Sequence, residues 1–456
     1  MALAAVWIAA PRGRSGGEGR VRGAFGRAWA WRALAVVSGL ALSWSLQSLA
    51  PARAADPVAA DYDACVRGAW PTVDDAEARI ASCSRALQSL KLTPEQVALA
   101  RLTRGVARYA LGDTIIASDD YQKALQHYDQ AIDPRSPDAL LLYRRGIARE
   151  GTGQTDKALE DFSNAIKAAP QRAVAYLDRG VLLATRMRAF ERAVGDFNRV
   201  LELDHDNVAA LIARGSADSE LGQYGRAQAD LDRAIALAPH SSDAYQRRAL
   251  ARSRAGQEKA ALEDYATALR LNPQNANALN GRAALEAAQG RYDLAIVDLD
   301  ASIAINAQNP MAFYNRGYAR FALQQYDRAI EDYNVAIALD PRMARAFNNR
   351  CLVRAITGKD LVRALNDCDT ALELTPLNLD VRATRGFVFL KLGDPQLALN
   401  EYNILLERDP NRALALYGRG LALVAAGKKA DGERDKAAGL ALDPAVADNF
   451  AKYGLK

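Results

Sequence analysis

The sequence has little of the material from which catalytic and metal sites are built. Its 456 residues include only three histidines and four cysteines, and aromatic side chains make up 7%. Half of the residues are hydrophobic and a quarter are charged. These are the proportions of a globular chain rather than of a disordered one or of one that crosses a membrane many times. The composition therefore gives little support to a metal-dependent or cofactor-dependent enzyme.

Excess positive charge is confined to the N-terminus. The formal net charge is +5, but residues 1–54 hold seven arginines and a single acid, Glu18. The other 402 residues carry 52 basic and 53 acidic side chains, so they are nearly neutral. A balanced main body gives no reason to expect a nucleic acid as partner.

Residues 1–54 have the organisation of an export signal. An arginine- and glycine-rich start is followed by a run of mostly Ala, Val, Leu and Ser from Ala33 to Leu49, and then by the small-x-small site Ala52-Arg53-Ala54. This order predicts cleavage after Ala54 and a periplasmic or secreted bacterial protein. The run contains four serines, a glycine and a glutamine, which makes it a weak membrane helix. An uncleaved inner-membrane anchor and an internal segment are the alternatives.

After residue 54 the sequence repeats with a period of 34 or 35 residues. A proline, or a residue in its place, marks each repeat end: Pro170, His205, Pro239, Pro273, Ala307, Pro341, Pro376, Pro410 and Pro444. Ten positions after each of the first eight lies a small residue: Gly180, Gly215, Ala249, Ala283, Gly317, Cys351, Gly386 and Gly420. A second small residue, alanine, recurs later in each repeat and is followed by Asp and an apolar or aromatic residue, as in Asp161-Phe162. A period of this length indicates a repeat architecture.

Each repeat has the pattern of two helices. Two stretches of about 12–14 residues carry apolar residues three and four positions apart, and Gly-containing turns such as Gly153-Gln154 separate them. The small residues allow the two helices to approach closely, and the proline ends the second one. Because one helix pair cannot bury both of its faces, the pairs must stack in a row.

The pattern resembles the tetratricopeptide repeat. The family's order of aromatic, small, small, aromatic, small and proline is matched by Phe313, Gly317, Ala329, Tyr333, Ala336 and Pro341. The resemblance implies an all-α, right-handed superhelical solenoid of about eleven helix-turn-helix units. It says almost nothing about which partner is bound.

We divide the chain into four segments. They are the signal or anchor at 1–54, a degenerate first repeat with a cysteine pair at 55–96, the solenoid at 97–410, and a polar capping repeat with a tail at 411–456. In the last repeat Gly432, Lys436 and Gly439 replace larger residues, as expected at a solvated end. We expect the tail, with Phe450 and Tyr453, to pack back as a short closing helix.

One repeat is longer than the others. The repeat that holds Gly105 has seven extra residues, which we place between Gly112 and Ala124. Seven residues are about two helical turns, so we expect a longer second helix rather than a protruding functional loop.

The cysteines form two pairs at similar spacing. Cys65 and Cys83 are 18 residues apart, and Cys351 and Cys368 are 17 apart. Cys351 takes the small-residue place of its first helix, and Cys368 takes the aromatic place of its second helix. In an exported chain this arrangement predicts the disulfides Cys65–Cys83 and Cys351–Cys368. The alternative is four buried thiols that fill core space.

In the resembled family the first helices line a concave channel that receives a peptide. Positions one, four and five after the small residue, and three before it, should face this channel. The candidate partner-binding residues are therefore Tyr143, Tyr314, Tyr318, Phe321, Asn348, Leu352, Ile356, Phe387, Leu390 and Tyr417. The alternative is that they pack against neighbouring helices. No asparagine follows the small position, which argues against the mode in which some family members bind a C-terminal carboxylate.

We expect a non-catalytic scaffold of the cell envelope that binds a protein or peptide in this channel, with no catalytic residue, cofactor or metal site and no nucleic acid partner. The histidines 127, 205 and 240 are far apart, and the last two lie at repeat boundaries. One alternative is an envelope assembly factor anchored by residues 33–49, which alone would bring the chain to a membrane. The other, an enzyme with an unrecognised site, is weaker because no acid–base pair is visible among the channel residues.

Overall fold

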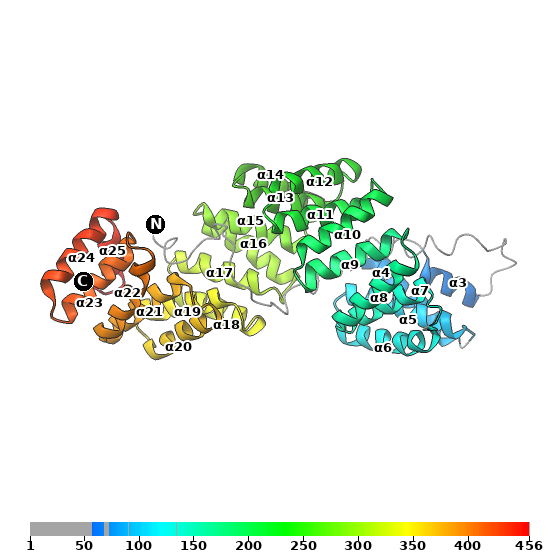
Figure 1. The fold of residues 1–456 in the computed structure, drawn as a ribbon, viewed down its shortest axis with the longest axis horizontal. Coiled ribbons are helices and arrows are strands. Elements are labelled where there is room, and N and C mark those ends of the chain that lie inside the picture. The colour runs from blue at the N-terminus through cyan, green and yellow to red at the C-terminus, as the bar shows by residue number, and fades with distance from the viewer. Residues whose placement is uncertain (1–56, 68–72, 90, 134, 456) are drawn as a thin grey trace. The chain divides into compact units, whose positions relative to one another are not determined.

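The computed structural model describes residues 57–67, 73–89, 91–133 and 135–455, and all regular elements in these ranges are α-helices (Figure 1). They form eleven consecutive pairs and a closing helix. The predicted export signal at 1–54 lies outside the described residues. Within the described ranges, none of the helices is long and apolar enough to cross a membrane.

The described residues form two compact units, divided between Asn275 and Ala276. The first unit holds α3 (Pro57–Val66), α4 (Val73–Gln88), α5 (Pro94–Ala110), α6 (Thr114–Ala131), α7 (Ala139–Gly151), α8 (Thr155–Ala168), α9 (Ala173–Arg186), α10 (Phe190–Leu203), α11 (Val208–Glu220), α12 (Tyr224–Leu237), α13 (Ser242–Arg254) and α14 (Glu258–Leu271). The second unit holds α15 (Ala276–Ala288), α16 (Tyr292–Ile305), α17 (Pro310–Ala322), α18 (Tyr326–Leu339), α19 (Ala344–Thr357), α20 (Leu361–Leu374), α21 (Leu379–Leu392), α22 (Pro395–Arg408), α23 (Ala413–Ala425), α24 (Lys429–Leu442) and α25 (Val446–Lys452). Each unit is a stack of helix pairs, which confirms the predicted all-α repeat solenoid.

Local sequence signals set the ends of the helices. At the start of α7 the Asp138 carboxylate accepts hydrogen bonds from the backbone N–H groups of Leu140 and Leu141, as a helix cap does. The turn to the second helix uses glycine in the left-handed region, as at Gly153 with φ 76°. The second helix α8 ends at Ala168, two residues before Pro170.

Inside a pair, the small residue of the first helix contacts the aromatic residue of the second. A Cβ atom added at Gly146 would lie 2.6 Å from Cε1 of Phe162, and one added at Gly180 would lie 2.6 Å from Cε1 of Phe197. Both rings are buried. The repeated glycine is therefore required by the distance between the two helices.

Each pair from α5–α6 onward also carries an ion pair between its two helices. An arginine directly before the small residue contacts an acid directly before the aromatic place, and these acids are buried or nearly so. The pairs are Arg104–Asp120, Arg145–Asp161, Arg179–Asp196, Arg214–Asp230, Arg248–Asp264, Arg282–Asp298, Arg316–Asp332, Arg350–Asp367, Arg385–Glu401 and Arg419–Asp435.

The longer repeat differs from the prediction in where its extra residues lie. The second helix α6 is longer, with 18 residues against 14 in α8, as expected. However, a Cβ at Gly105 would contact the ring of Tyr121, and Arg104 binds Asp120, so this repeat is regular as far as Tyr121. The placement between Gly112 and Ala124 is therefore wrong. The extra residues extend the end of α6 and the connection to α7, because the register is fixed by the contacts around Gly105.

Both cysteine pairs lie at disulfide bonding distance. The S–S distances are 2.10 Å for Cys65–Cys83 and 2.12 Å for Cys351–Cys368. All four side chains are buried. In the α19–α20 pair the disulfide takes the place of the glycine–aromatic contact of other repeats, as the sequence positions predict.

Candidate functional site

Nine of the ten predicted channel residues come together in the second unit. They lie on its successive first helices α17, α19, α21 and α23, whereas Tyr143 lies on α7 in the first unit. We call the nine the groove face: Tyr314, Tyr318, Phe321, Asn348, Leu352, Ile356, Phe387, Leu390 and Tyr417. All except Asn348 belong to one hydrophobic cluster.

Most of the groove face is buried. Phe387 and Leu352 are each 1% exposed, and Tyr314, Phe321, Asn348 and Tyr417 are also buried. Tyr143 is buried in its own unit. These seven residues therefore pack against neighbouring parts of the structure, which is the alternative interpretation given by the sequence. Only Tyr318, Ile356 and Leu390 are partly exposed.

The closing helix α25 covers part of the groove face. Its Phe450 is 1% exposed, and the Phe450 ring lies 5.3 Å from the Tyr417 ring and 6.1 Å from the Phe387 ring, measured between centroids. Tyr453, directly after α25, meets Phe387 edge-on at 6.3 Å. The aromatic rings of α21 and α23 are thus buried by residues that come from the end of the chain.

A lysine of the same face binds the backbone of the closing segment. The Lys391 Nζ atom donates a hydrogen bond to the carbonyl oxygen of Tyr453 at 2.9 Å. Lys391 lies on α21, five positions after the small residue Gly386. This spacing is that of a predicted channel position, although Lys391 is not among the predicted partner-binding residues.

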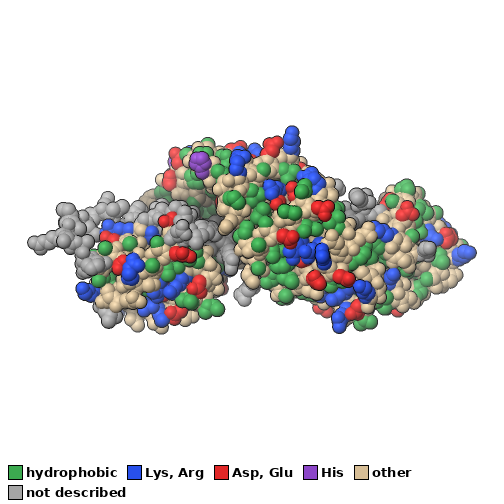
Figure 2. Space-filling model, turned by 180° about the vertical axis from the view of Figure 1, so that it is seen from behind, with side chains coloured by type: hydrophobic (Ala, Val, Ile, Leu, Met, Phe, Trp, Pro, Cys, Tyr) green, Lys and Arg blue, Asp and Glu red, His purple; other side chains and the backbone are tan. Residues whose placement is uncertain are grey.

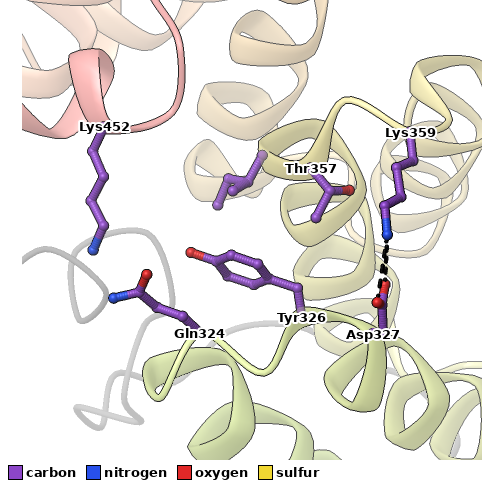
Figure 3. Close-up of a pocket in the computed structure, with 7 residues that line it drawn as sticks. Gln324, Tyr326, Asp327, Thr357, Lys359 and Lys452 are labelled. Atoms are coloured by element: carbon purple, nitrogen blue, oxygen red, sulfur yellow. Dashed lines mark hydrogen bonds and ion pairs between the residues drawn. The ribbon is translucent and has the colours of Figure 1, made fainter.

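A pocket of about 440 Å³ lies beside the end of α25. It is lined by Gln324, Tyr326, Asp327, Ile356, Thr357, Lys359 and Lys452. Figure 3 shows the Tyr326 hydroxyl directed toward the side chains of Gln324 and Lys452. The Lys359 Nζ atom forms an ion pair with Asp327 at 3.2 Å on the other side. One groove-face residue, Ile356, therefore borders an open cavity.

Gln324 has a left-handed backbone at this pocket. Its φ angle is 61°, at the turn position that glycine holds in neighbouring repeats, such as Gly290 and Gly358. A residue with a Cβ pays about 1–2 kcal/mol for this conformation. Arg188, with φ 52°, has the same conformation at the equivalent turn of an earlier repeat, so the conformation of Gln324 follows from the turn of the repeat.

The first unit contains a buried polar cluster around Tyr143. The Tyr143 hydroxyl donates to the Asp178 carboxylate at 2.7 Å, across two successive repeats. Glu150, also on α7, is buried, and its Oε1 atom has no hydrogen-bond partner. Burial, and then the nearby Asp178, raise the Glu150 pKa to about 8, while Arg186 lowers it by less. Burial raises the pKa of Asp178 to about 7.

The face of the molecule shown in Figure 2 carries charges of both signs. On the face in Figure 2, Lys and Arg side chains are interspersed with Asp and Glu. Many arginines of the first helices are held in the ion pairs described above. Within the described ranges, no three His, Cys, Asp or Glu side chains gather in a metal-binding arrangement.

Two sets of residues were missed by the sequence analysis. The interhelical Arg–acid pairs recur at a spacing of 16 or 17 residues, so a search for opposite charges with the repeat period would have found them. The cluster of Tyr143, Glu150 and Asp178 joins two repeats and carries no such periodic signal.

Comparison with solved structures finds helical-repeat proteins of low identity. The Cut9–Hcn1 hetero-tetramer of the APC/C is 15% identical over 84% of this chain and 90% of that chain, with a TM-score of 0.49. A tetratricopeptide repeat protein of Parabacteroides merdae is 19% identical over 57% and 99%, with a TM-score of 0.45. The pilF protein of Pseudomonas aeruginosa is 20% identical over 46% and 94%, with a TM-score of 0.42. No functional inference follows from similarities at this level.

Comparison with family profiles identifies the repeats. No curated protein matches the sequence. A profile described as bacterial transcriptional activator domain matches residues 138–274. A TPR repeat profile matches residues 317–355, and a tetratricopeptide repeat profile matches 247–310 and 384–447. Together with the 34-residue period and the stacked helix pairs, these matches show that the chain belongs to the tetratricopeptide repeat family, an architecture of protein-interaction scaffolds.

Proposed function

We propose that the chain is an exported, non-catalytic scaffold that binds a protein or peptide on the groove face of its second unit. The observation that carries this proposal is the row of partly exposed apolar side chains Tyr318, Ile356 and Leu390. They lie on the first helices α17, α19 and α21 of three successive repeats. Apolar and aromatic side chains repeated at this spacing suit an extended or helical peptide.

The buried residues of the groove face pack against these three side chains and hold them in place. Leu352 and Phe387 are held in the same hydrophobic cluster, so the partly exposed residues need little reordering when a partner arrives. A surface that is already ordered loses less conformational entropy on binding. This favours a preformed binding surface over one that folds with its partner.

Export is supported by two features that lie far apart in the sequence. The first is the basic, apolar and small-x-small order of residues 1–54. The second is the pair of buried disulfides, which persist in oxidising compartments such as the periplasm. The alternative, an assembly factor anchored at the inner membrane, rests on the apolar run 33–49. N-terminal sequencing of the native protein separates them, since a start at Ala55 rejects the anchor.

The binding proposal is tested with a double variant of two partly exposed residues, Tyr318→Ala with Ile356→Ala. The matched control is Val297→Ala with Val335→Ala, which truncates two exposed side chains on the second helices α16 and α18. Tagged proteins are expressed in the native compartment, cross-linked and purified, and the captured proteins are quantified by mass spectrometry.

We expect the groove variant to lose at least tenfold in capture of its main partner, while the control captures as much as the unmodified protein. Thermal unfolding of both should change by only a few degrees. A replacement of Phe387 is unsuitable for this test, because a buried aromatic truncated to alanine costs about 3–5 kcal/mol of folding free energy. Equal capture by all three proteins would reject the groove face as the binding site.

A further inference from the structure

The closing segment binds the groove face as a peptide ligand would. Phe450 places its ring against Phe387 of α21 and Tyr417 of α23, side chains from two successive repeats. Tyr453, three residues later, adds a second aromatic contact to Phe387. Tyr453 is the C-cap residue that ends α25, and both rings face the same surface because both contact Phe387.

The segment is also held through its backbone. The hydrogen bond from Lys391 Nζ goes to the Tyr453 carbonyl oxygen and not to a side chain. Gly454 follows with φ 84°, and a Cβ atom there would lie 3.1 Å from Lys391 Nζ. Aromatic anchors in pockets combined with a main-chain hydrogen bond are the means by which peptides are recognised.

The closing segment is short. The helix α25 has seven residues, fewer than an isolated helix needs for stability in water. Its Lys452 borders the open pocket with Tyr326 and the left-handed Gln324. The segment thus covers one part of the groove face and leaves Ile356, at the pocket, accessible.

We propose that α25 is a displaceable occupant of the groove face, and that the partner's binding segment is a short helix with two aromatic side chains three residues apart. This inference rests on the proposed function. The partner's aromatic residues replace Phe450 and Tyr453 on Phe387 and Tyr417, Lys391 binds the partner's backbone, and the pocket beside Tyr326 receives the continuation of the partner chain.

The test uses a labelled synthetic peptide of residues 444–456 as the probe. Its binding is measured by fluorescence anisotropy to the full-length protein and to the full-length variant Phe450→Ala with Tyr453→Ala. A peptide in which the same two aromatics are alanine is the control. We expect the variant to bind the probe at least tenfold more tightly than the unmodified protein does, and to ignore the control peptide.

Equal binding of the probe by both proteins, or binding by neither, would overturn the proposal. Hydrogen exchange of the unmodified protein gives a test that needs no variant. We expect the amides of α25 to exchange at least tenfold faster than those of α23, and equal protection would show that α25 is a fixed cap. A dimer of the unmodified protein that disappears in the double variant would assign the face to a second copy and contradict the proposal.

The two proposals can fail separately. If the peptide binds the variant but the Tyr318 and Ile356 replacements leave partner capture unchanged, α25 is displaceable and the proposed function is wrong. If those replacements abolish capture while the peptide fails to bind, the groove face binds a partner and α25 is not its competitor.

Discussion

Arg248 of α13 and Asp264 of α14 form a bidentate ion pair between the two helices of one repeat. Arg248 donates from Nε to Oδ2 at 2.9 Å and from Nη2 to Oδ1 at 2.7 Å, and Asp264 is buried. Arg252 donates to the same carboxylate at 2.8 Å. Because two arginines surround one buried acid, the acid is neutralised where water cannot reach it. The equivalent ion pair recurs in nine other repeats.

Removing the acid takes the buried carboxylate away from Arg252 and leaves Arg248 only the exposed Asp232. We expect Asp264→Asn to lower the free energy of unfolding of the first unit by about 3 kcal/mol, as when one member of a buried pair is lost. The control is Asp232→Asn, because exposed Asp232 also binds Arg248, at 2.6 Å. That surface replacement should cost under about 1 kcal/mol. Urea unfolding followed by circular dichroism measures both, and equal costs would contradict this account of the ion pair.

Replacing two glycines of one repeat by alanine should change the free energy of unfolding in opposite directions, because only Gly180 lies where the two helices approach closely. Gly180→Ala places a methyl group 2.6 Å from the buried Phe197 ring, so we expect a loss of about 1–3 kcal/mol in stability. Gly195 lies exposed within helix α10 with no atom near an added Cβ. Gly195→Ala should stabilise by roughly 0.5–1 kcal/mol through helix propensity. Thermal unfolding distinguishes the two, and a stabilising Gly180→Ala would refute the packing argument.

The buried Glu150 predicts a pH effect on stability. Burial raises its pKa to about 8, with Asp178 adding to the shift and Arg186 opposing it. The folded protein therefore keeps a proton between about pH 4.5 and 8 that the unfolded chain releases. Under proton linkage this contribution lowers the free energy of unfolding as pH rises through that window. The neighbouring Asp178, whose pKa burial raises to about 7, contributes in the same direction, whereas Tyr121 and Tyr143, both with raised pKa values, do not titrate in this window.

Glu150→Gln isolates this contribution. We expect the variant to match the unmodified protein near pH 5 and to exceed it in stability by at least about 1 kcal/mol at pH 8, since one pKa unit corresponds to about 1.4 kcal/mol. Urea unfolding at both pH values measures the difference. A variant whose stability differs from the unmodified protein by the same amount at pH 5 and pH 8 would show that Glu150 titrates normally.

The two disulfides predict that the protein has no free thiol in its native compartment. Because all four cysteines are buried, protein taken from its native compartment is denatured before alkylation; it should then add no label without reduction and four labels after it, one for each cysteine. Loss of Cys351–Cys368, which joins α19 to α20, should cost about 3 kcal/mol on the chain-entropy account of a loop of this length. Four labels without reduction would instead indicate buried thiols and argue against export.

Contacts within one repeat were predictable because the sequence repeats them at fixed spacing. The pairing of Cys351 with Cys368 followed from the places of Gly317 and Tyr333 one repeat earlier. The place of the extra residues in α6 was mistaken because alanine recurs at both Ala117 and Ala124, and only the contacts of Gly105 decide between them.

Contacts between distant repeats were not predictable in this way. Phe387 occupies a channel position by spacing, but it is buried partly because Phe450, 63 residues later, folds back onto it. No periodic pattern connects these two residues. The side of each first helix was therefore predictable, whereas the exposure of its side chains depends on a non-repeating segment at the end of the chain.

The most direct test of the central claim, that a partner binds the groove face, is photo-cross-linking from single positions. A photoreactive phenylalanine analogue replaces Tyr318 on α17 or, as control, Val297 on α16, in protein expressed in its native compartment. We predict that the Tyr318 position yields one dominant protein adduct and that the Val297 position does not yield it. The same adduct at equal yield from Val297, or its absence at Tyr318 when the partner still co-purifies, would contradict the account.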